Sequence, residues 1–369
     1  MIEGGSILVT GANGGLGSAI VERILQDSEF AACTGIFIVR KSATATNLKN
    51  KLSAAPERSH KIIETQLDSI ADVKEAAAEI NSEVAAGTLP PLRAIILAAA
   101  YQDSTELCLT TDGYEATWQI NFLSNFILVL SLLQSCDKQH GRIVLISSWS
   151  HDFTDSRNDV VGNAYKDQRY TTLFPDAEAL GKGSWSTPTE DPSADAGYRR
   201  YGASKLCAAM FLYVFSKLGP QQFVYAQNDV VSLPSVESSF ELGERLANDP
   251  TLSKVGVVGI DPGAMPTDLG RRGSIIAQFK IKIIMPLLAA PSRYLSPNGL
   301  FRLPSKSAED TIRAAFEVDL PQDEVLYLNG TDNYTAAKET MDRQKRKELW
   351  QYALQVSCIG EQDTALAQW

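Results

Sequence analysis

Short apolar runs alternate with longer amphipathic stretches along most of the chain. Apolar residues recur at helical spacing in the stretches 15–26, 42–53, 69–86, 112–135 and 201–218. The runs between them are apolar at nearly every position, as expected of buried strands: 6–10, 34–39, 60–67, 93–100, 141–148 and 254–260. This order predicts an α/β fold, a Rossmann-like, doubly wound parallel sheet with helices on both faces.

Two segments interrupt the alternation. Residues 149–198 are rich in Ser, Asp, Gly and Pro and keep neither a helical nor a strand period. A loop this long inside a compact domain is usually functional or partly disordered. Residues 219–236 are a second irregular stretch before an expected helix at 237–248. A charged amphipathic helix is predicted at 335–356, packed on the sheet, so we expect one domain over 1–369.

Composition limits the classes of function. The net charge of −10 argues against a nucleic-acid surface, which needs an excess of Lys and Arg. Five scattered cysteines without a C-x-x-C pair, and three separate histidines, indicate a reduced cytoplasmic protein without a metal site. We find no secretory signal and no run of the roughly 20 apolar residues that span a bilayer. The nearest run, 274–290, is interrupted by Lys280, Lys282 and Pro286, which favours a lid or buried helix over a membrane-surface patch.

A glycine-rich turn joins the first strand to the first helix. The run "TGANGGLG" contains Gly11, Gly15 and Gly17, and glycine allows backbone N–H groups to approach a pyrophosphate closely. The second strand then ends in Val39 and is followed by Arg40 and Lys41, without the acid that binds the ribose of NAD. We therefore predict a dinucleotide site that prefers NADP, although two solvated charges at a strand end remain the alternative.

Polar residues that suit proton transfer follow. "YGASK" spaces Tyr201 and Lys205 four residues apart, so both lie on one helix face. By itself this motif is common among ordinary helix residues. "ISS" ends a strand with Ser148, where ligands bind such sheets, although its serines could equally cap the next segment. Asn121 lies in a very apolar helix, where an unpaired amide costs about 1–3 kcal/mol, so a water or a backbone carbonyl must bind it.

Taken together, the sequence motifs of this chain resemble those of a known family. "TGANGGLG", "QINF", "ISS", "YGASK" and "DPGAMPT" occur in the order found in short-chain dehydrogenases/reductases, over most of residues 6–270. The runs "TTDGYEATWQINFLSNFIL" and "RIVLISSWSH" resemble the retinol dehydrogenase and protochlorophyllide oxidoreductase branch, in a fungal-type member. The resemblance implies that Tyr201 is the acid/base and Lys205 its partner, that Ser148 binds the substrate carbonyl and that Asn121 holds a relay water. It implies NADP(H) binding by Gly11, Asn13, Gly15, Leu16, Gly17, Arg40, Asp68, Asn121, Tyr201, Lys205, Pro262, Gly263 and Thr267.

The chain departs from the family in three places. "LAAA" at 97–100 replaces the usual asparagine-containing run, Ser148 and Tyr201 are unusually far apart because of 149–198, and 219–236 interrupts the region after the catalytic helix. We expect 149–198 to shape or cover the substrate pocket and 268–300 to form a substrate lid.

The expected activity is NADPH-dependent reduction of the carbonyl of a hydrophobic ketone or aldehyde, such as a secondary metabolite, terpenoid or steroid-like molecule. Tyr201 would be the acid, with its pKa lowered by Lys205. Reduction of an enone C=C bond is the alternative, and a non-catalytic NADP-binding scaffold is a third reading. A homodimer and peripheral membrane contact both stay open.

Overall fold

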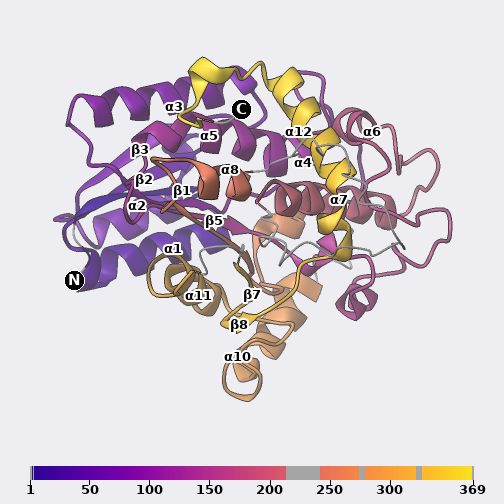
Figure 1. Cartoon of the computed structure of the whole chain (residues 1–369). Coiled ribbons are helices and arrows are strands. Elements are labelled where there is room, and N and C mark those ends of the chain that lie inside the picture. The colour runs from indigo at the N-terminus through magenta and orange to yellow at the C-terminus, as the bar shows by residue number, and fades with distance from the viewer. Residues whose placement is uncertain are drawn as a thin grey trace, which may run out of the picture.

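A single eight-stranded sheet forms the centre of the protein (Figure 1). The computed structural model describes residues 2, 4–212, 242–273, 278, 280–320 and 326–367. The strand order is β3-β2-β1-β4-β5-β6-β7-β8, with every neighbouring pair parallel except β7 and β8. The strands are β1 (Gly5–Thr10), β2 (Cys33–Val39), β3 (His60–Glu64), β4 (Leu92–Leu97), β5 (Arg142–Ile146), β6 (Gly256–Asp261), β7 (Leu326–Asn329) and β8 (Asp332–Asn333).

Helices cover both faces of this sheet, which confirms the predicted doubly wound α/β domain (Figure 1). Alternate residues of β1 show the division: Ile7 and Val9 pack in one core, whereas Leu8 packs in the other. The first core is completed by α1 (Gly15–Gln26), α2 (Thr46–Ser53) and α11 (Pro304–Phe316). The second contains α3 (Ile70–Ala85), α5 (Ser124–Leu132), α7 (Ala194–Leu212), α8 (Leu242–Asn248) and α12 (Arg343–Ser357).

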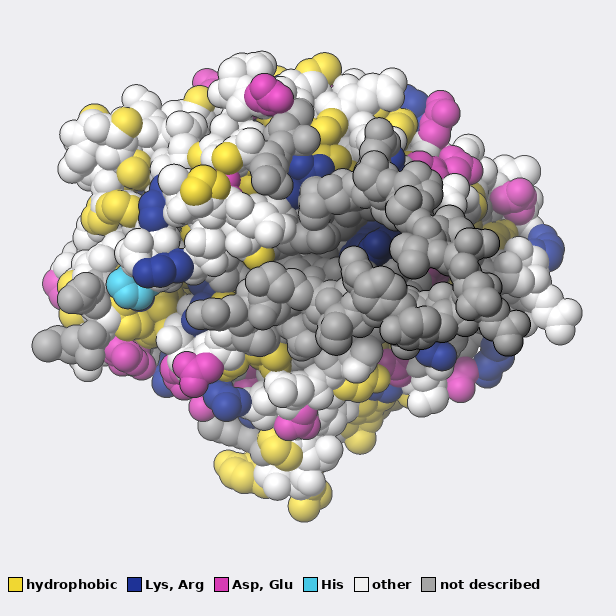
Figure 2. Space-filling view, viewed as in Figure 1, with side chains coloured by type: hydrophobic (Ala, Val, Ile, Leu, Met, Phe, Trp, Pro, Cys, Tyr) yellow, Lys and Arg dark blue, Asp and Glu magenta, His cyan; other side chains and the backbone are white. Residues whose placement is uncertain are grey.

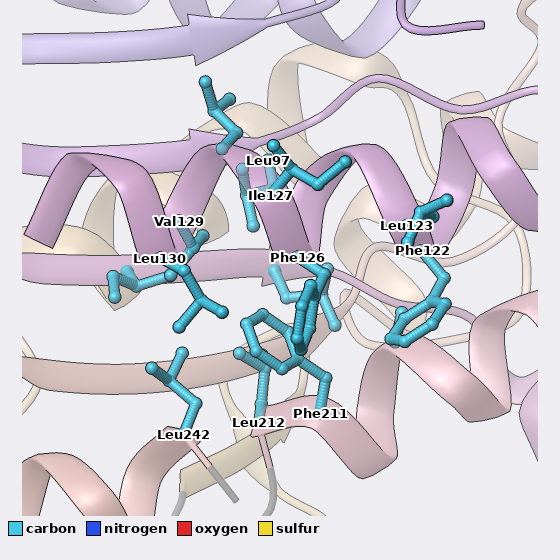
Figure 3. Close-up of a cluster of buried hydrophobic side chains, with 14 of the residues drawn as sticks. Leu97, Phe122, Leu123, Phe126, Ile127, Val129, Leu130, Phe211, Leu212 and Leu242 are labelled. Carbon is cyan, nitrogen blue, oxygen red and sulfur yellow. The ribbon is translucent and has the colours of Figure 1, made fainter. Parts of the chain in front are cut away.

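The most apolar helix lies inside the second core. Figure 3 shows α5 side chains meeting Phe211 and Leu212 of α7, and the ring centroids of Phe126 and Phe211 are 5.1 Å apart. The continuous helical stretch Ala116–Ser135 has the length and hydropathy of a membrane span, yet its most apolar 18 residues are all buried within the protein. Burial on all sides explains why its sequence shows no polar face.

The structure corrects several predicted boundaries. The helix expected to begin at residue 201 begins at Ala194, seven residues earlier, so Tyr201 lies in its middle rather than at its start. The helix expected at 335–356 begins at Arg343, after a 3-10 turn. Strands β7 and β8 and helix α11 were not predicted from the sequence. Segment 219–236 lies outside the described residues, as does part of 237–248.

The two irregular regions contain short elements. Residues 149–198 contain α6 (Ala177–Lys182), two 3-10 turns at Trp149–His151 and Ser156–Val160, and the start of α7. Hydrogen bonds hold these short elements in place. None of them continues a helical or strand period over a long stretch, which explains why the sequence shows no periodicity. The predicted lid contains a 3-10 turn at Asp268–Arg272, a π-turn at Lys280–Ile284 and α10 (Met285–Leu295).

Candidate active site

The glycine-rich turn is packed too tightly for side chains. Gly11 has a φ of +65°, and a Cβ there would lie 2.8 Å from the Cα of Ala99. A Cβ on Gly17 would lie 2.1 Å from the Gly11 carbonyl oxygen. A Cβ on Gly15 would lie 2.4 Å from Cγ2 of Thr267, so the loop after β6 directly meets this turn. Helix α1 follows without a side-chain cap, which leaves its first N–H groups for an anionic ligand. This cradle fits a pyrophosphate.

Basic residues lie beside the turn, on the side of β2 and β3. Arg40 directly follows β2 and is exposed. Burial lowers the pKa of Arg271, and the charges of Arg272 and then Arg40 lower it further. These three cations are therefore close together near the end of β2. Asp68 follows β3, the partner strand of β2, and is half-buried. The side-chain oxygen of Asn13 accepts a hydrogen bond from the Leu48 N–H at 3.1 Å, so Asn13 joins the turn to α2.

Tyr201, Ser148 and Lys205 come together at the carboxyl end of β5. The hydroxyl of Tyr201 lies near the side chain of Ser148, which helps to lower the pKa of the phenol and itself accepts from the Ser150 hydroxyl at 2.9 Å. The Lys205 ammonium donates to the carbonyl of Ile146 at 2.8 Å and lies 5.8 Å from the centre of the Tyr201 ring. Tyr201 and Lys205 are both buried. The one-turn spacing thus places phenol and ammonium at one site.

Burial dominates the ionisation of both groups. It raises the pKa of the Tyr201 phenol, and the nearby Ser148 side chain lowers it by less, while the Asp261 charge adds to the rise. Burial likewise lowers the pKa of Lys205 to about 8, against the opposing charge of Asp261. In the chain by itself the pKa of the phenol is therefore raised and not lowered as expected, because burial outweighs the effects that favour the phenolate. A phenol that stays protonated at neutral pH is a proton donor.

A π-turn positions Asn121. The turn Gln119–Leu123 interrupts the helical stretch, as π-turns often do at functional sites. The Asn121 side chain accepts from the Tyr101 N–H at 2.8 Å and donates to the Tyr101 carbonyl and the Ser204 hydroxyl, both at 2.9 Å. Of the two partners predicted for this amide, the structure shows the backbone carbonyl. Asn121 therefore fixes the chain after β4 against α7.

The loop after β6 is rigidly held. Gly263 has a φ of +75°, and a Cβ there would lie 2.9 Å from Cδ of the buried Arg302. The Ser307 hydroxyl donates to the carbonyl of Pro262 at 2.7 Å. Together with the contact between Gly15 and Thr267, these bonds hold the predicted cofactor loop across from the glycine-rich turn.

The insertion 149–198 is attached to the residues directly before Tyr201. The Tyr198 hydroxyl donates to Asn158 at 2.9 Å, and the Arg199 guanidinium donates to the carbonyl of Ala164 at 3.0 Å. Arg200 donates to the carbonyl of Ser186 at 2.8 Å. Three consecutive side chains of α7 therefore hold the insertion over the site.

A buried ion pair connects the same insertion to the end of β6. Arg157 donates to Asp261 at 2.9 Å and also binds Asp155. The guanidinium lies between the rings of Trp149 and Tyr334, 5.3 Å and 5.1 Å from their centres. Asp261 is 1% exposed, so Arg157 provides a cation for a carboxylate that water hardly reaches.

His151 joins Ser148 to a distant part of the chain. Its Nε2 accepts from the N–H of Ala337 at 3.0 Å, so the ring proton lies on Nδ1, which donates to the Ser148 carbonyl at 2.5 Å. Burial lowers the pKa of His151, which keeps the ring neutral. His151 positions the backbone of Ser148.

Sequence reasoning assigned no role to Arg157, Asp261 or His151. One signal for Asp261 was present, because an acid at the end of the apolar run 254–260 needs a buried cation. Nothing local identified Arg157 as that cation. Among the described residues, no group of three His, Cys, Asp or Glu side chains is arranged to hold a metal.

Comparison with known proteins agrees with this fold. Residues 6–155 match the family model for short chain dehydrogenase. The chain is 37% identical over 391 aligned positions to the short-chain dehydrogenase iccH of Talaromyces variabilis, covering 100% of each chain. It is 24% identical to protochlorophyllide reductase B of Hordeum vulgare, covering 58% of this chain and 52% of that protein. A short chain dehydrogenase from Burkholderia cenocepacia in complex with NADP has a similar fold, with a TM-score of 0.50 at 17% identity, over 87% of this chain and 92% of that one.

The protein is thus an α/β oxidoreductase with a Rossmann-like sheet. It belongs to the short-chain dehydrogenase/reductase family.

Proposed function

We propose that this protein is an NADPH-dependent reductase that reduces the carbonyl group of a hydrophobic ketone or aldehyde. The position of the Tyr201 hydroxyl near the Ser148 side chain, beside the buried Lys205, carries the proposal. Two neighbouring hydroxyls can both donate to one carbonyl oxygen, which is the site of growing negative charge during reduction.

Each side chain has a defined task. The nicotinamide supplies hydride when the cofactor is bound. Ser148 orients the carbonyl oxygen, and Tyr201 gives that oxygen its proton, which a buried phenol with a raised pKa still holds at neutral pH. The Lys205 ammonium, held by Ile146, binds the cofactor ribose and stabilises the phenolate that remains. Asn121 holds the water through which the phenolate regains a proton.

The residues around the glycine-rich turn support NADP rather than NAD. Arg40 follows β2, and its charge lowers the pKa of Arg271. Cations this close repel one another unless an anion lies between them, and the 2′-phosphate of NADP is such an anion. Gly11, Gly15, Leu16 and Gly17 line the pyrophosphate, and Asp68 accepts from the adenine amino group. The solved Burkholderia relative holds NADP in the same fold.

Aromatic side chains near the site favour a hydrophobic substrate. Trp149 and Tyr198 are buried beside the site residues, and Phe153 packs on the second core. Segment 268–300 would close over the bound molecule. A secondary metabolite, terpenoid or steroid-like ketone would suit a site with these aromatic side chains. The fungal relative iccH is similar in sequence over its whole length.

The test compares Tyr201→Phe with Tyr198→Phe, which removes a neighbouring buried hydroxyl from the same helix. With a panel of ketones, aldehydes and enones, Tyr201→Phe should lower turnover by about 10²-fold or more and leave the affinity for NADPH unchanged. Tyr198→Phe should keep turnover within a few-fold. Full activity in Tyr201→Phe overturns the proposal.

Reduction of a C=C bond is the second candidate, favoured by the similarity to protochlorophyllide reductase B. Tyr201 would then protonate carbon instead of oxygen. Product analysis after transfer of deuteride from labelled NADPH separates the two, because the label appears on a carbinol carbon in one case and on a saturated carbon in the other. No oxidation of NADPH with any substrate class would point to a non-catalytic scaffold.

A further inference from the structure

Exposed apolar side chains are concentrated on α10 and the π-helical turn directly before it. Ten large hydrophobic residues are exposed in the described part of the chain, and six of them lie within 283–295. These six define the α10 surface: Ile283, Ile284, Leu287, Leu288, Tyr294 and Leu295. Figure 1 shows α10 projecting at the lower end of the molecule, and Figure 2 shows hydrophobic side chains gathered there.

The α10 helix is fixed on its opposite side. Ala289 is fully buried, and the Ser292 hydroxyl donates to the carbonyl of Phe301. Ile284, Leu287, Leu288 and Leu295 follow the spacing i, i+3, i+4 and i+11, so they form one stripe that faces away from the protein. Leu287 is 71% exposed and Leu295 is 84% exposed. An anchored helix with an apolar outer face needs a partner for that face.

The charge of the residues around the α10 surface distinguishes between two possible partners, a second copy of the chain and a lipid surface. Residues 269–308 contain seven Lys and Arg and no Asp or Glu, whereas the whole chain has a net charge of −10, so the remainder carries −17 (−10 − 7). Within this segment Lys282 is exposed, whereas Arg302 is buried and Arg272 and Lys306 pair with Asp103 and Asp310. A second copy seated symmetrically on the α10 surface would bring this basic segment against itself, with no acid in the segment to pair with Lys282. A negatively charged lipid surface meets both the apolar stripe and this exposed lysine.

We propose that the α10 surface docks the protein onto a membrane that contains anionic lipid. The apolar stripe enters the boundary between headgroups and acyl chains, Tyr294 lies at the level of the headgroups, and Lys282 contacts their phosphates. The acidic remainder of the protein is repelled by the same membrane, so docking occurs in one orientation. A hydrophobic molecule dissolved in the bilayer would then reach the predicted lid without crossing water.

The test is co-sedimentation of the full-length protein with two kinds of vesicle, phosphatidylcholine alone and phosphatidylcholine mixed with phosphatidylserine. Binding should occur with the mixed vesicles and weaken as salt is raised. Leu287→Asp should weaken it at least about tenfold, because one fully buried leucine contributes about 1.5–3 kcal/mol. The matched control is Leu109→Asp, which places the same charge on an exposed leucine outside 269–308 and should bind like the wild type.

A second variant separates charge from folding defects. Lys282→Glu leaves the apolar stripe intact and should reduce binding to mixed vesicles, and the melting temperature of each variant should match that of the wild type. Absence of binding to mixed vesicles at low salt overturns the proposal. So does equal binding to both vesicle types, or a dimer in light scattering that Leu287→Asp dissociates, because the partner is then a second copy of the chain.

Discussion

Arg157, near the start of the insertion, donates to Asp261 at the end of β6, although the two residues are 104 positions apart in the sequence. The Asp261 carboxylate is almost completely buried, and its charge raises the pKa of both Tyr201 and Lys205. The same charge acts to raise the pKa values of His151 and Tyr327. The ion pair therefore connects the insertion to the ionisation of the proposed proton donor.

Removal of Arg157 should shift the pH dependence of turnover. In Arg157→Met the buried Asp261 charge loses its partner, so the pKa of Tyr201 rises and the alkaline decline in activity moves to higher pH. Breaking such a pair also costs about 3–5 kcal/mol of stability. The double variant Arg157→Met, Asp261→Asn should return the pH profile towards that of the wild type, as read from turnover between neutral and alkaline pH.

The control for this prediction is Arg169→Met. Arg169 binds Asp167 through the same two-residue spacing as Arg157 and Asp155, but it is exposed and lies outside the site. Its replacement should leave the profile unchanged. An unshifted profile in Arg157→Met together with normal stability would show that the pair has no influence on Tyr201.

Arg40→Ala should weaken NADPH binding far more than NADH binding. The guanidinium is expected to bind the 2′-phosphate, which only NADPH carries, and charged hydrogen bonds of this kind are worth about 1.5–3 kcal/mol, or roughly 10- to 100-fold in affinity. Fluorescence titration with each cofactor measures the difference. Arg271→Ala should show the same selectivity to a smaller degree, whereas equal loss of both cofactors in Arg40→Ala would contradict the assignment.

Gly11→Ala and Gly87→Ala separate backbone strain from close packing. Both glycines have positive φ angles, +65° and +74°, so alanine is strained at each. An added Cβ meets Ala99 at 2.8 Å at Gly11 and nothing within 4 Å at Gly87. Gly87→Ala should lower stability by about 1 kcal/mol and keep cofactor binding. Gly11→Ala should lose more stability and also weaken NADPH binding, as followed by thermal melting and titration.

His151 should make the protein sensitive to mild acid. Its pKa is lowered from 6.5 in the folded chain, so the unfolded chain binds the proton more readily. Stability is therefore lost as the pH falls through about 6.5, before most carboxylates titrate. His151→Gln should be less stable at pH 7, because the bonds to Ser148 and Ala337 are altered, and its melting temperature should fall less between pH 7 and 5.5. A parallel fall in both proteins would exclude His151 as the titrating group.

The sequence determined what depends on local pattern. The apolar runs predicted six of the eight strands, because a strand that is buried on both faces is apolar at nearly every position. The helical spacing predicted α1 with its observed boundaries. Glycines at Gly11 and Gly17 signalled a turn in which no Cβ fits. The spacing of Tyr201 and Lys205 correctly placed both at one site, since four residues make about one helical turn.

Only the tertiary structure decided which polar groups are paired and which charges are buried. Arg157 meets Asp261 across 104 residues, and His151 meets Ala337 across 186, contacts that no local period encodes. The raised pKa of Tyr201 likewise follows from burial beneath the insertion rather than from the motif that contains it. The physical reason is the same in each case: desolvation and charge pairing depend on distance in space, which the folded chain sets and the sequence pattern does not.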